Sequence, residues 1–543
     1  MSTGISRRQG VLAGLLAVIA PFTVAAAPYR ATGHQGLPLG SAGLPQTRTV
    51  QQIAPGVSLT TIVRGRVSPA DHWTVDVAVP TGAVPPTLDP DTPQSVLGSQ
   101  ANADAIAAKL TAAGYAPTVS EQDSPAFRGF AGGPQGYVVR VGAFADQPSA
   151  TALAGTLAKL GYATSTLYTG MDSTQSDGPW VLHELVIDPH QFKGSVEESH
   201  GGTMTGRRTT SQLATTAGAL AAVNGGFFVI SPGDGTPGES AGMVVENGKV
   251  LRESTDGRIT AILRDGGRRL QFAELTTRLT VSVDGTRHTI QGLNRPAGLI
   301  RDCGHPGDQP TSKPLMDVTC TNANESVMLT PEFGAAPPAG PGEQAVIDRS
   351  GRVVSLGARD GAAVPAGDSV LQSIGTEASW LSGALKVGQQ VSLQTRVTDE
   401  HGRPVTFGPH DSVVNGGPQL LEGGHQAIAP VADGIAHPGD PSYFYGWGIR
   451  RNPRTVIGKD AQGRVVLLEA DGREPGYSQG LTLEEEAKAL RSLGVVAAMN
   501  LDGGGSSAMY VGNGLVSRPS DATGERPVGD AVVVVPAAAS TGG

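Results

Sequence analysis

Two acidic residues end apolar segments in the C-terminal part of the chain. Asp471 ends RVVLLEAD, and Asp502 ends VVAAMNLD. The segment between them has a helical pattern, so the three elements predict a strand–helix–strand unit, which is nearly always a right-handed parallel crossover. Both strands then end at one edge of a sheet, where open α/β sheets bind ligands. We therefore expect the two carboxylates to face one crevice and to act as acid, base or nucleophile.

The turn after Asp502 combines glycines with hydroxyl residues, and its members are Gly503, Gly504, Gly505, Ser506 and Ser507. Glycines leave backbone N–H groups uncovered and let them approach an anion, while hydroxyls add donors. The turn is therefore a candidate phosphate site. A plain glycine hairpin between two strands is the alternative.

Asparagines recur at comparable strand ends. Asn500 precedes Asp502 by two residues, Asn224 opens a turn with Gly225 and Gly226, and Asn415 opens a third such turn. A single Asn-Gly pair is most often only a turn. Three of them predict one surface of amides and exposed backbone, as sugar hydroxyls require.

Arginines offer positive charge without a basic surface. Arg454 in RTVIG and Arg526 in ERPV could bind phosphate oxygens through the fork of the guanidinium group. A surface or structural role is the alternative for each. Glu525 and Glu239 are reserve carboxylates for the chemistry.

The requirement for a metal stays open at this point. Oxygen ligands from Asp471, Asp502 and nearby carbonyls could hold Ca²⁺, and no other cofactor is indicated. The histidines lack zinc-site spacing, and the sequence contains no Gly-x-Ser-x-Gly motif.

Residues 178–536 are predicted to form the domain that positions these candidate site residues. Strand patterns and glycine turns dominate it, in keeping with 76 glycines and 39 prolines in the chain. Helices are predicted only at 210–218 and 482–494, the second with a capping box of Thr482 and Glu485. The expected class is α+β, a strand-rich mixed-sheet catalytic domain with few helices.

An internal repeat marks a smaller domain at 71–169. Two helical segments, 101–119 and 148–166, share the pattern Leu-x-x-x-Gly-Tyr-Ala, and strands at 73–80 and 137–144 precede them. This is βαβ twice, which predicts a ferredoxin-like βαββαβ sheet. The stretch resembles a SPOR domain, although a Pro-rich insert at 81–95 departs from the pattern. The resemblance implies binding to peptidoglycan glycan strands that lack stem peptides, and a spacer without ligand is the alternative.

The two cysteines, Cys303 and Cys320, form an even and locally spaced pair. In an exported chain such a pair is most often a structural disulfide. It would close a polar loop and stabilise the fold by roughly 3 kcal/mol.

Residues 1–27 have the charged start, apolar run and small residues of a signal peptide, with a partial twin-arginine pattern at Arg7-Arg8. Residues 28–70 are expected to form a linker and a leading strand. The apolar run is too short for a membrane span, so none is expected in the mature chain. A net charge of −9 without a basic block argues against nucleic acid as a partner. The expected location is secreted or associated with the cell wall.

Across about residues 180–535 the chain resembles the phosphodiester glycosidase family. Seven blocks carry the resemblance, in the expected order: AVNGGFF (222–228), VNGGPQLLEGG (414–424), RTVIG (454–458), ADGR (470–473), GLTLEE (480–485), NLDGGGSS (500–507) and ERPVGDA (525–531). The resemblance implies hydrolysis of a sugar–phosphate diester on its glycosidic side, and it adds Arg473 to the candidate substrate-binding residues.

The resulting hypothesis is an exported hydrolase that releases a sugar from a phosphodiester in a wall or extracellular glycopolymer. The arginines and the glycine turn hold the phosphate, the asparagines hold the sugar, and Asp502 or Asp471 attacks or activates water. Two alternatives remain: a non-catalytic protein that binds peptidoglycan or polysaccharide, and a hydrolase of another glycan linkage on the same fold.

Overall fold

The computed structural model describes residues 36–80, 95–172 and 175–537. The predicted signal peptide lies outside these residues, as does nearly all of the Pro-rich segment 81–95. In the described ranges, strands make up most of the regular secondary structure, in agreement with the predicted α+β class. None of the helices found there has the length and apolar character needed to cross a membrane.

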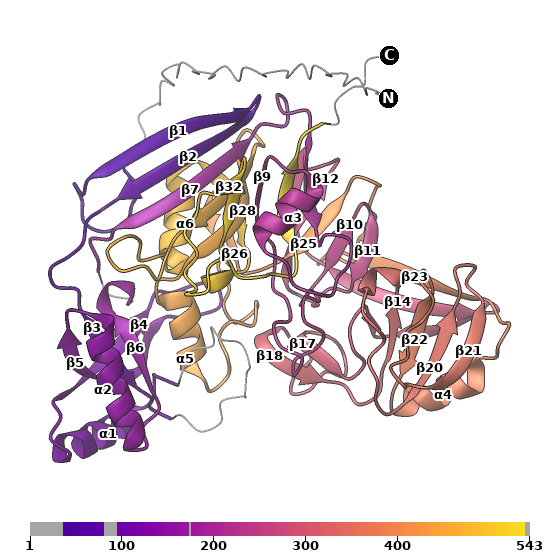
Figure 1. The fold of residues 1–543 in the computed structure, drawn as a ribbon, viewed down its shortest axis with the longest axis horizontal. Helices are drawn as coiled ribbons and strands as arrows, with labels where there is room; N and C mark the ends of the chain where they lie inside the picture. Colours follow the sequence, from indigo (N-terminus) through magenta and orange to yellow (C-terminus); the bar gives the residue numbers. More distant parts are fainter. Residues whose placement is uncertain (1–35, 81–94, 173–174, 538–543) are drawn as a thin grey trace, which may run out of the picture. The chain divides into compact units, whose positions relative to one another are not determined.

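The largest sheet carries both acidic strand ends, and Figure 1 shows its strands β1, β2, β7, β28 and β26. Its eight strands lie in the order β1-β2-β7-β29-β28-β30-β26-β27. Because β28 is antiparallel to both β29 and β30, those two strands are parallel and end at the same edge, as the sequence predicts. The strands are β1 (Gln46–Ala54), β2 (Val57–Arg64), β7 (Trp180–Ile187), β26 (Gln419–Glu422), β27 (His425–Gln426), β28 (Arg454–Asp460), β29 (Val465–Ala470) and β30 (Val495–Asn500).

Helix α6 (Leu483–Ser492) connects β29 to β30 and packs on this sheet. The predicted capping box is present, with Thr482 and Glu485 each accepting from the other's backbone N–H. Leu483, Ala487 and Leu490 bury the apolar stripe of the helix in the core. The crossover is therefore fixed by a cap at its start and by burial along one face.

Two further five-stranded sheets share the core with the large sheet. Leu185, Leu263 and Val532, one from each of the three sheets, belong to a single apolar cluster. Helix α3 (Thr210–Ala217) is the second predicted helix, and it ends at Gly218 in the left-handed conformation. The strands of one sheet are β8 (Ser195–Ser199), β9 (Ala221–Asn224), β31 (Met509–Val511), β32 (Gly514–Leu515) and β33 (Ala531–Val535), and those of the other are β10 (Val244–Glu246), β11 (Lys249–Arg252), β12 (Ile259–Arg264), β13 (Arg269–Glu274) and β25 (Ser412–Asn415).

Residues 276–405 form a pair of sheets with a core of their own, beside helix α4 (Thr376–Ala384). Between the strands of this pair the chain forms a separate hairpin of β17 (Leu299–Cys303) and β18 (Leu315–Thr321), which the predicted Cys303–Cys320 disulfide closes. The paired sheets contain β14 (Thr276–Val283), β15 (Thr286–Ile290), β23 (Val391–Thr398) and β24 (Pro404–Val405) in one, and β16 (Gly292–Leu293), β19 (Ser326–Leu329), β20 (Glu343–Ile347), β21 (Val353–Ala358) and β22 (Ser369–Ser373) in the other.

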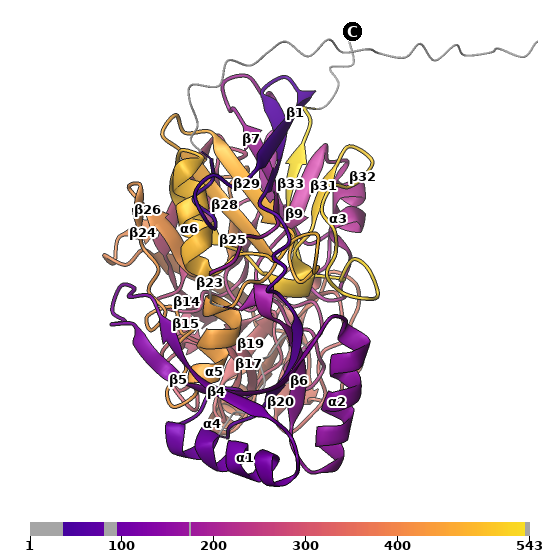
Figure 2. The same cartoon turned by 90° about the vertical axis from the view of Figure 1, so that its left-hand side faces the viewer.

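The repeat region folds as a four-stranded antiparallel sheet in the order β4-β5-β3-β6, and α1 and α2 share one apolar core with it (Figure 2). The chain order is β3 (Trp73–Val77), α1 (Gln100–Ala112), β4 (Pro117–Ser124), β5 (Gly133–Phe144), α2 (Gln147–Lys159) and β6 (Thr164–Tyr168). Gly114 and Gly161, the repeated glycines, follow the two helices with positive φ. They terminate the helices as the repeat predicts.

The segment before the repeat contains the expected leading strand as β2, together with a second strand, β1. Strands β1 and β2 form a hairpin, and β2 pairs along its whole length with β7. Residues 46–64 therefore extend the large sheet of the C-terminal region instead of linking two domains. The repeat region is thus flanked on both sides by strands of one sheet.

Candidate active site

A pocket that is partly open to solvent lies beside the shared edge of β29 and β30. It is lined by the first residues of the glycine turn, by four arginines, by three aspartates and by aromatic rings. The lining residues are Phe227, Phe228, Ile230, Ala241, Arg301, Asp302, Met316, Asp317, Tyr443, Trp447, Asn452, Arg454, Arg473, Asp502, Gly503, Gly504 and Arg526.

Asp502 is the predicted carboxylate that reaches this pocket, and it is half-buried. Its backbone N–H donates to the carbonyl of Gly225 (3.1 Å), and its own carbonyl accepts from Asn224 Nδ2 (2.8 Å). Its Oδ1 accepts from the N–H of Gly503 at 2.9 Å. The backbone on both sides of Asp502 is therefore fixed, which holds its carboxylate toward the pocket.

The glycine turn is held by its own backbone hydrogen bonds and fixes Asp502, and it is not an open site for an anion. The N–H of Gly504 donates to the carbonyl of Pro453, and the N–H groups of Ser506 and Ser507 donate back into the turn. Both serine side chains are buried outside the pocket lining. The sequence-based prediction that this turn offers its amides and hydroxyls to phosphate is therefore corrected, because most of those amides already have acceptors.

Gly505 has a separate steric role. A Cβ at this position would meet Nη2 of Arg526 at 2.1 Å and Oδ1 of Asp521 at 2.2 Å. These two side chains form an ion pair, with Nε to Oδ2 at 2.8 Å. Glycine at 505 thus lets Arg526 reach the pocket wall.

The three predicted asparagines are fully buried and do not line the pocket. Asn224 Oδ1 accepts from Thr455 and Nδ2 binds the carbonyl of Asp502, while Asn500 Nδ2 donates to the carbonyl of Gly417. Asn415 Oδ1 accepts from the N–H of Phe227 at 2.9 Å. The structure therefore gives no support to their predicted role in holding sugar hydroxyls, since these amides bond to the loops around the pocket.

Gly225 and Gly226 belong to the same closely packed loops as the three asparagines. A Cβ on Gly225 would lie 2.2 Å from Oδ1 of Asp530, and one on Gly226 would lie 2.4 Å from the carbonyl oxygen of Asn415. The N–H of Gly226 donates to Asp530 Oδ1 at 3.0 Å. Neither glycine lines the pocket, so both serve close backbone packing behind Phe227.

All three predicted arginines line the pocket, where their positive charges suit a phosphate. Arg454 is fully buried, its guanidinium lies over the ring of Trp447, and its Nη2 donates to the Trp447 carbonyl at 2.6 Å. Burial lowers the pKa of Arg454 to about 10, against the opposing effect of Glu486, so the group stays charged at neutral pH. Arg473, at positive φ, donates to Asn452 Oδ1.

The sequence did not reveal the opposite wall. Asp302 and Asp317 come from the disulfide hairpin, and both have positive φ. Asp302 pairs with Arg258 at 2.7 Å, and Asp317 pairs with Arg301. The only signal in the sequence was their position next to the predicted disulfide loop, far along the chain from the recognised blocks.

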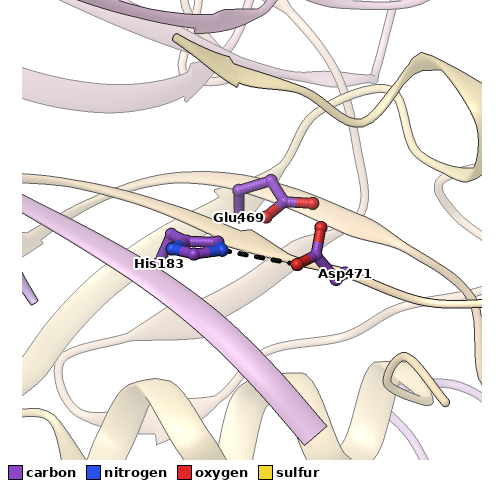
Figure 3. Close-up of side chains that lie close together, drawn as sticks. All are labelled: His183, Glu469 and Asp471. Carbon is purple, nitrogen blue, oxygen red and sulfur yellow. Dashed lines mark hydrogen bonds and ion pairs between the residues drawn. The ribbon is translucent and has the colours of Figure 1, made fainter. Parts of the chain in front are cut away.

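Asp471 does not line the pocket, although its strand ends at the predicted edge. It is fully buried, and Figure 3 shows it beside His183 and Glu469, with Asp471 Oδ2 3.3 Å from His183 Nε2. The hydroxyl of Tyr477 donates to Oδ2 (2.9 Å) and the N–H of Arg518 to Oδ1 (2.6 Å). The expected meeting of two carboxylates in one cleft is therefore not found, because Asp471 is satisfied inside the protein.

The reserve carboxylates also lie elsewhere. Glu525 Oε1 accepts from the N–H of Ser211 in the first turn of α3, at 2.8 Å. Glu239 is fully buried 3.7 Å from Arg252, and burial raises its pKa to about 7. Neither lines the pocket, so a catalytic role for them has no support from this geometry.

Among the residues that the structure describes, two groups of side chains could hold a metal ion. One comprises His183, Glu469 and Asp471, and the other comprises Glu198, His200 and Glu246; in each, the ligand atoms lie within 4.8 Å of one another. Burial, and then Asp471, raise the pKa of Glu469. Within the described residues, neither group includes Asp502, so the Ca²⁺ site that would join Asp471 to Asp502 is not found.

Comparisons with known proteins agree with the motifs. A family model described as phosphodiester glycosidase matches residues 342–535, and a SPOR domain model matches residues 96–169. The mouse and human proteins named N-acetylglucosamine-1-phosphodiester alpha-N-acetylglucosaminidase are each 46% identical over 68 residues. The match covers 12% of this chain and 13% of each of those proteins.

Solved structures extend the likeness over most of the chain. A putative exported protein from Burkholderia pseudomallei is 32% identical, with a TM-score of 0.83, and the match covers 94% of this chain and 100% of that one. A hypothetical protein from Synechocystis, at 18% identity and a TM-score of 0.50, covers 90% of this chain and 76% of its own, and shares the fold.

Proposed function

Because residues 342–535 match the phosphodiester glycosidase family model, we propose that this chain hydrolyses the glycosidic bond of a sugar-1-phosphodiester in the pocket that contains Asp502. The observation that carries the proposal is the convergence of this half-buried carboxylate with Arg454, Arg473 and Arg526 on one pocket. These four residues lie within the part of the chain that matches the family model.

The lining suits both parts of such a substrate. Guanidinium groups bind phosphate oxygens through paired N–H donors. Tyr443, Trp447 and Phe227 supply flat apolar surface against which a sugar ring can pack. A sugar joined to a phosphate therefore meets complementary groups on both sides of the bond to be cut.

Asp502 acts at the anomeric carbon, either as the nucleophile or as the base that removes a proton from water. The bond between the anomeric carbon and the phosphate oxygen breaks, and its electron pair leaves with the phosphate as a phosphomonoester. Because the arginines stabilise that leaving group, a strong general acid is less necessary than in ordinary glycoside hydrolysis. Retention or inversion at the anomeric carbon separates the two roles of Asp502.

Synthetic sugar-1-phosphodiesters test the proposal. The expected products are a free reducing sugar and a phosphomonoester, whereas a phosphorylated sugar would identify cleavage at the phosphorus–oxygen bond. Asp502→Asn should lower turnover by at least about 1,000-fold without loss of folding, because the charge is lost and the side-chain shape is kept. Glu525→Gln is the control, and it should keep turnover near that of the wild type. Binding without any turnover by the wild-type protein would reject the enzymatic proposal in favour of a non-catalytic role.

The SPOR domain supports a place for this reaction at the cell wall. The order β4-β5-β3-β6, with both helices in one core, is the arrangement expected for a ferredoxin-like domain. We propose that the domain binds peptidoglycan glycan strands and that the chain is exported by the predicted signal peptide. Co-sedimentation with purified peptidoglycan sacculi, with and without stem peptides, tests the binding, and no retention on either would contradict it.

A further inference from the structure

A second pocket, partly open to solvent, lies where the SPOR domain meets the C-terminal region. One wall comes from the SPOR domain and the short turn after β6, and the other comes from the residues around Asn452. The lining residues are Trp73, Gln147, Thr166, Leu167, Tyr168, Met171, Gly446, Arg450, Arg451, Asn452 and Arg473. We call this pocket the junction groove.

The junction groove and the Asp502 pocket share part of their walls. Asn452 and Arg473 line both. Arg473 donates from Nε and Nη2 to Asn452 Oδ1, at 3.1 and 2.9 Å. The two pockets therefore adjoin at this pair of residues.

The chemistry of the groove differs from that of the Asp502 pocket. Two of its arginines are neutralised, because Arg450 pairs with Asp76 at 2.6 Å and Arg451 pairs with Glu485 at 2.7 Å. The half-buried ring of Trp73 packs against Tyr168, with centroids 5.6 Å apart. Aromatic surface with a few polar groups, and with little uncompensated charge on these arginines, suits an uncharged sugar chain better than a phosphate.

The two walls are held together by buried ion pairs. Asp76 of β3 accepts from Arg140 at 2.9 Å and from Arg450 at 2.6 Å, while Asp172 pairs with Arg140 at 2.7 Å. The carboxylates of both aspartates are almost fully buried. The groove is therefore formed before a ligand arrives, which reduces the entropy lost on binding.

We propose that the junction groove binds the uncharged glycan portion of a polymeric substrate whose phosphodiester occupies the Asp502 pocket. The SPOR domain then contributes a subsite of the enzyme and makes it selective for polymers over short phosphodiesters. The part of this inference that concerns cleavage in the Asp502 pocket rests on the proposed function. Binding of glycan in the junction groove can be measured without catalysis.

Kinetics on two substrates test the inference in the full chain. Trp73→Ala should lower kcat/KM at least about 10-fold on a glycopolymer with internal sugar-1-phosphodiester links, which equals the loss of about 1.4 kcal/mol of binding. The same variant should change kcat/KM less than about twofold on a synthetic phosphodiester with a methyl aglycone. Trp73→Phe should restore most of the polymer activity. Equal losses on both substrates, or no loss on the polymer, would overturn the inference.

A second groove variant and a control variant away from the groove separate an effect on binding from an effect on folding. Gln147→Ala removes an exposed side chain of the groove and should also weaken polymer turnover selectively. Trp380→Ala removes a tryptophan that stacks on His288 away from the groove, and it should leave both substrates unaffected.

Direct binding distinguishes failure of this inference from failure of the proposed function. Soluble glycan strands from peptidoglycan, titrated into the Asp502→Asn chain, should bind, and Trp73→Ala in that background should abolish the binding. If the wild type hydrolyses phosphodiesters but the strands bind equally with and without Trp73, the inference fails alone. If no phosphodiester is hydrolysed while binding depends on Trp73, the proposed function fails and the groove remains a glycan site.

Discussion

Gly505 decides whether Arg526 can stand at the wall of the Asp502 pocket. The Cβ of an alanine there would overlap both members of the Arg526–Asp521 ion pair, at 2.1 and 2.2 Å. We expect Gly505→Ala to displace the guanidinium and to lower kcat/KM about 100-fold, because a shift of about 1 Å in a positioning group has that effect. Steady-state kinetics on a synthetic sugar-1-phosphodiester provides the measurement.

Gly514→Ala is the matched control for this substitution. Gly514 lies in β32, is exposed, and has no heavy atom within 4 Å of an added Cβ. It should retain the kinetics of the wild type. An unchanged kcat/KM in Gly505→Ala would show that Arg526 has no part in binding the substrate.

At the level of single residues, the sequence predicted which charged side chains line the pocket better than it predicted the hydrogen-bond partners of the asparagines. Arg454 begins β28 and Asp502 follows the end of β30, whereas Arg473 and Arg526 reach the pocket from the segments after β29 and before β33. The asparagines Asn224 and Asn500 have equally suggestive positions, but neighbouring backbone groups occupy their amides. Which partner an amide takes depends on loops distant in the sequence, and no local pattern contains that information.

The disulfide hairpin of β17 and β18 is the element that brings Asp302 and Asp317 to the pocket. We expect Cys303→Ser combined with Cys320→Ser to destabilise the protein by roughly 3 kcal/mol, because the unfolded chain regains the freedom of the loop. KM for the phosphodiester should rise more than kcat falls, since the hairpin forms one wall and does not carry Asp502. Urea unfolding and steady-state kinetics measure the two effects, and an unchanged KM would exclude the hairpin from the binding site.

Helix α6 contains a buried carboxylate whose protonation should make stability depend on pH. Glu486 Oε2 lies 4.0 Å from Arg454 Nε, and burial raises the pKa of Glu486 to about 8, against the opposing effect of Arg454. The folded state therefore keeps a proton that the unfolded chain releases above its ordinary pKa of 4.5. The corresponding stability is fully present below that value and is lost as the pH rises through about 8.

In the wild type, the raised pKa of Glu486 should make the free energy of unfolding fall between about pH 5 and about pH 8. Glu486→Gln removes the titrating carboxyl, so this fall should be smaller in the variant. Urea unfolding at several pH values measures the slope. Glu484→Gln, on the same helix but in an ion pair with Lys488 that is partly exposed, should keep the slope of the wild type. A slope in Glu486→Gln that equals the wild-type slope would show that Glu486 is ionised in the folded protein.

At the level of elements, individual helices were easier to predict from the sequence than the pairing of strands into sheets. The capped helix α6 and the helix α3 follow from local residues, and the structure contains both. Local patterns could not show that β2, the second strand of the β1–β2 hairpin, pairs with β7 across the inserted SPOR region. Pairing between strands so distant in the sequence is decided by burial in the completed core.

For the molecule as a whole, the important feature is that the described residues form one compact unit. The SPOR domain joins the rest through the buried cluster of Asp76, Arg140, Asp172 and Arg450. Burial alone would raise the pKa of Asp172, but Arg140 and Arg450 lower it to about 2. Because that folded value lies below the ordinary 3.8, the stabilisation is present above about pH 4 and is lost as the pH falls toward about 2.

Asp76→Asn should therefore loosen the SPOR domain at neutral pH and weaken the whole protein. Removing one partner leaves a buried guanidinium incompletely compensated, so we expect a loss of roughly 3 kcal/mol in the free energy of unfolding. Amide hydrogen exchange should accelerate in α1, α2 and β6. The exposed pair of Arg128 and Glu422 also connects the two regions, at 2.9 Å. Glu422→Gln should change neither stability nor exchange measurably, because water screens that pair. If both variants behaved alike, the buried cluster would not be what holds the SPOR domain against the C-terminal region.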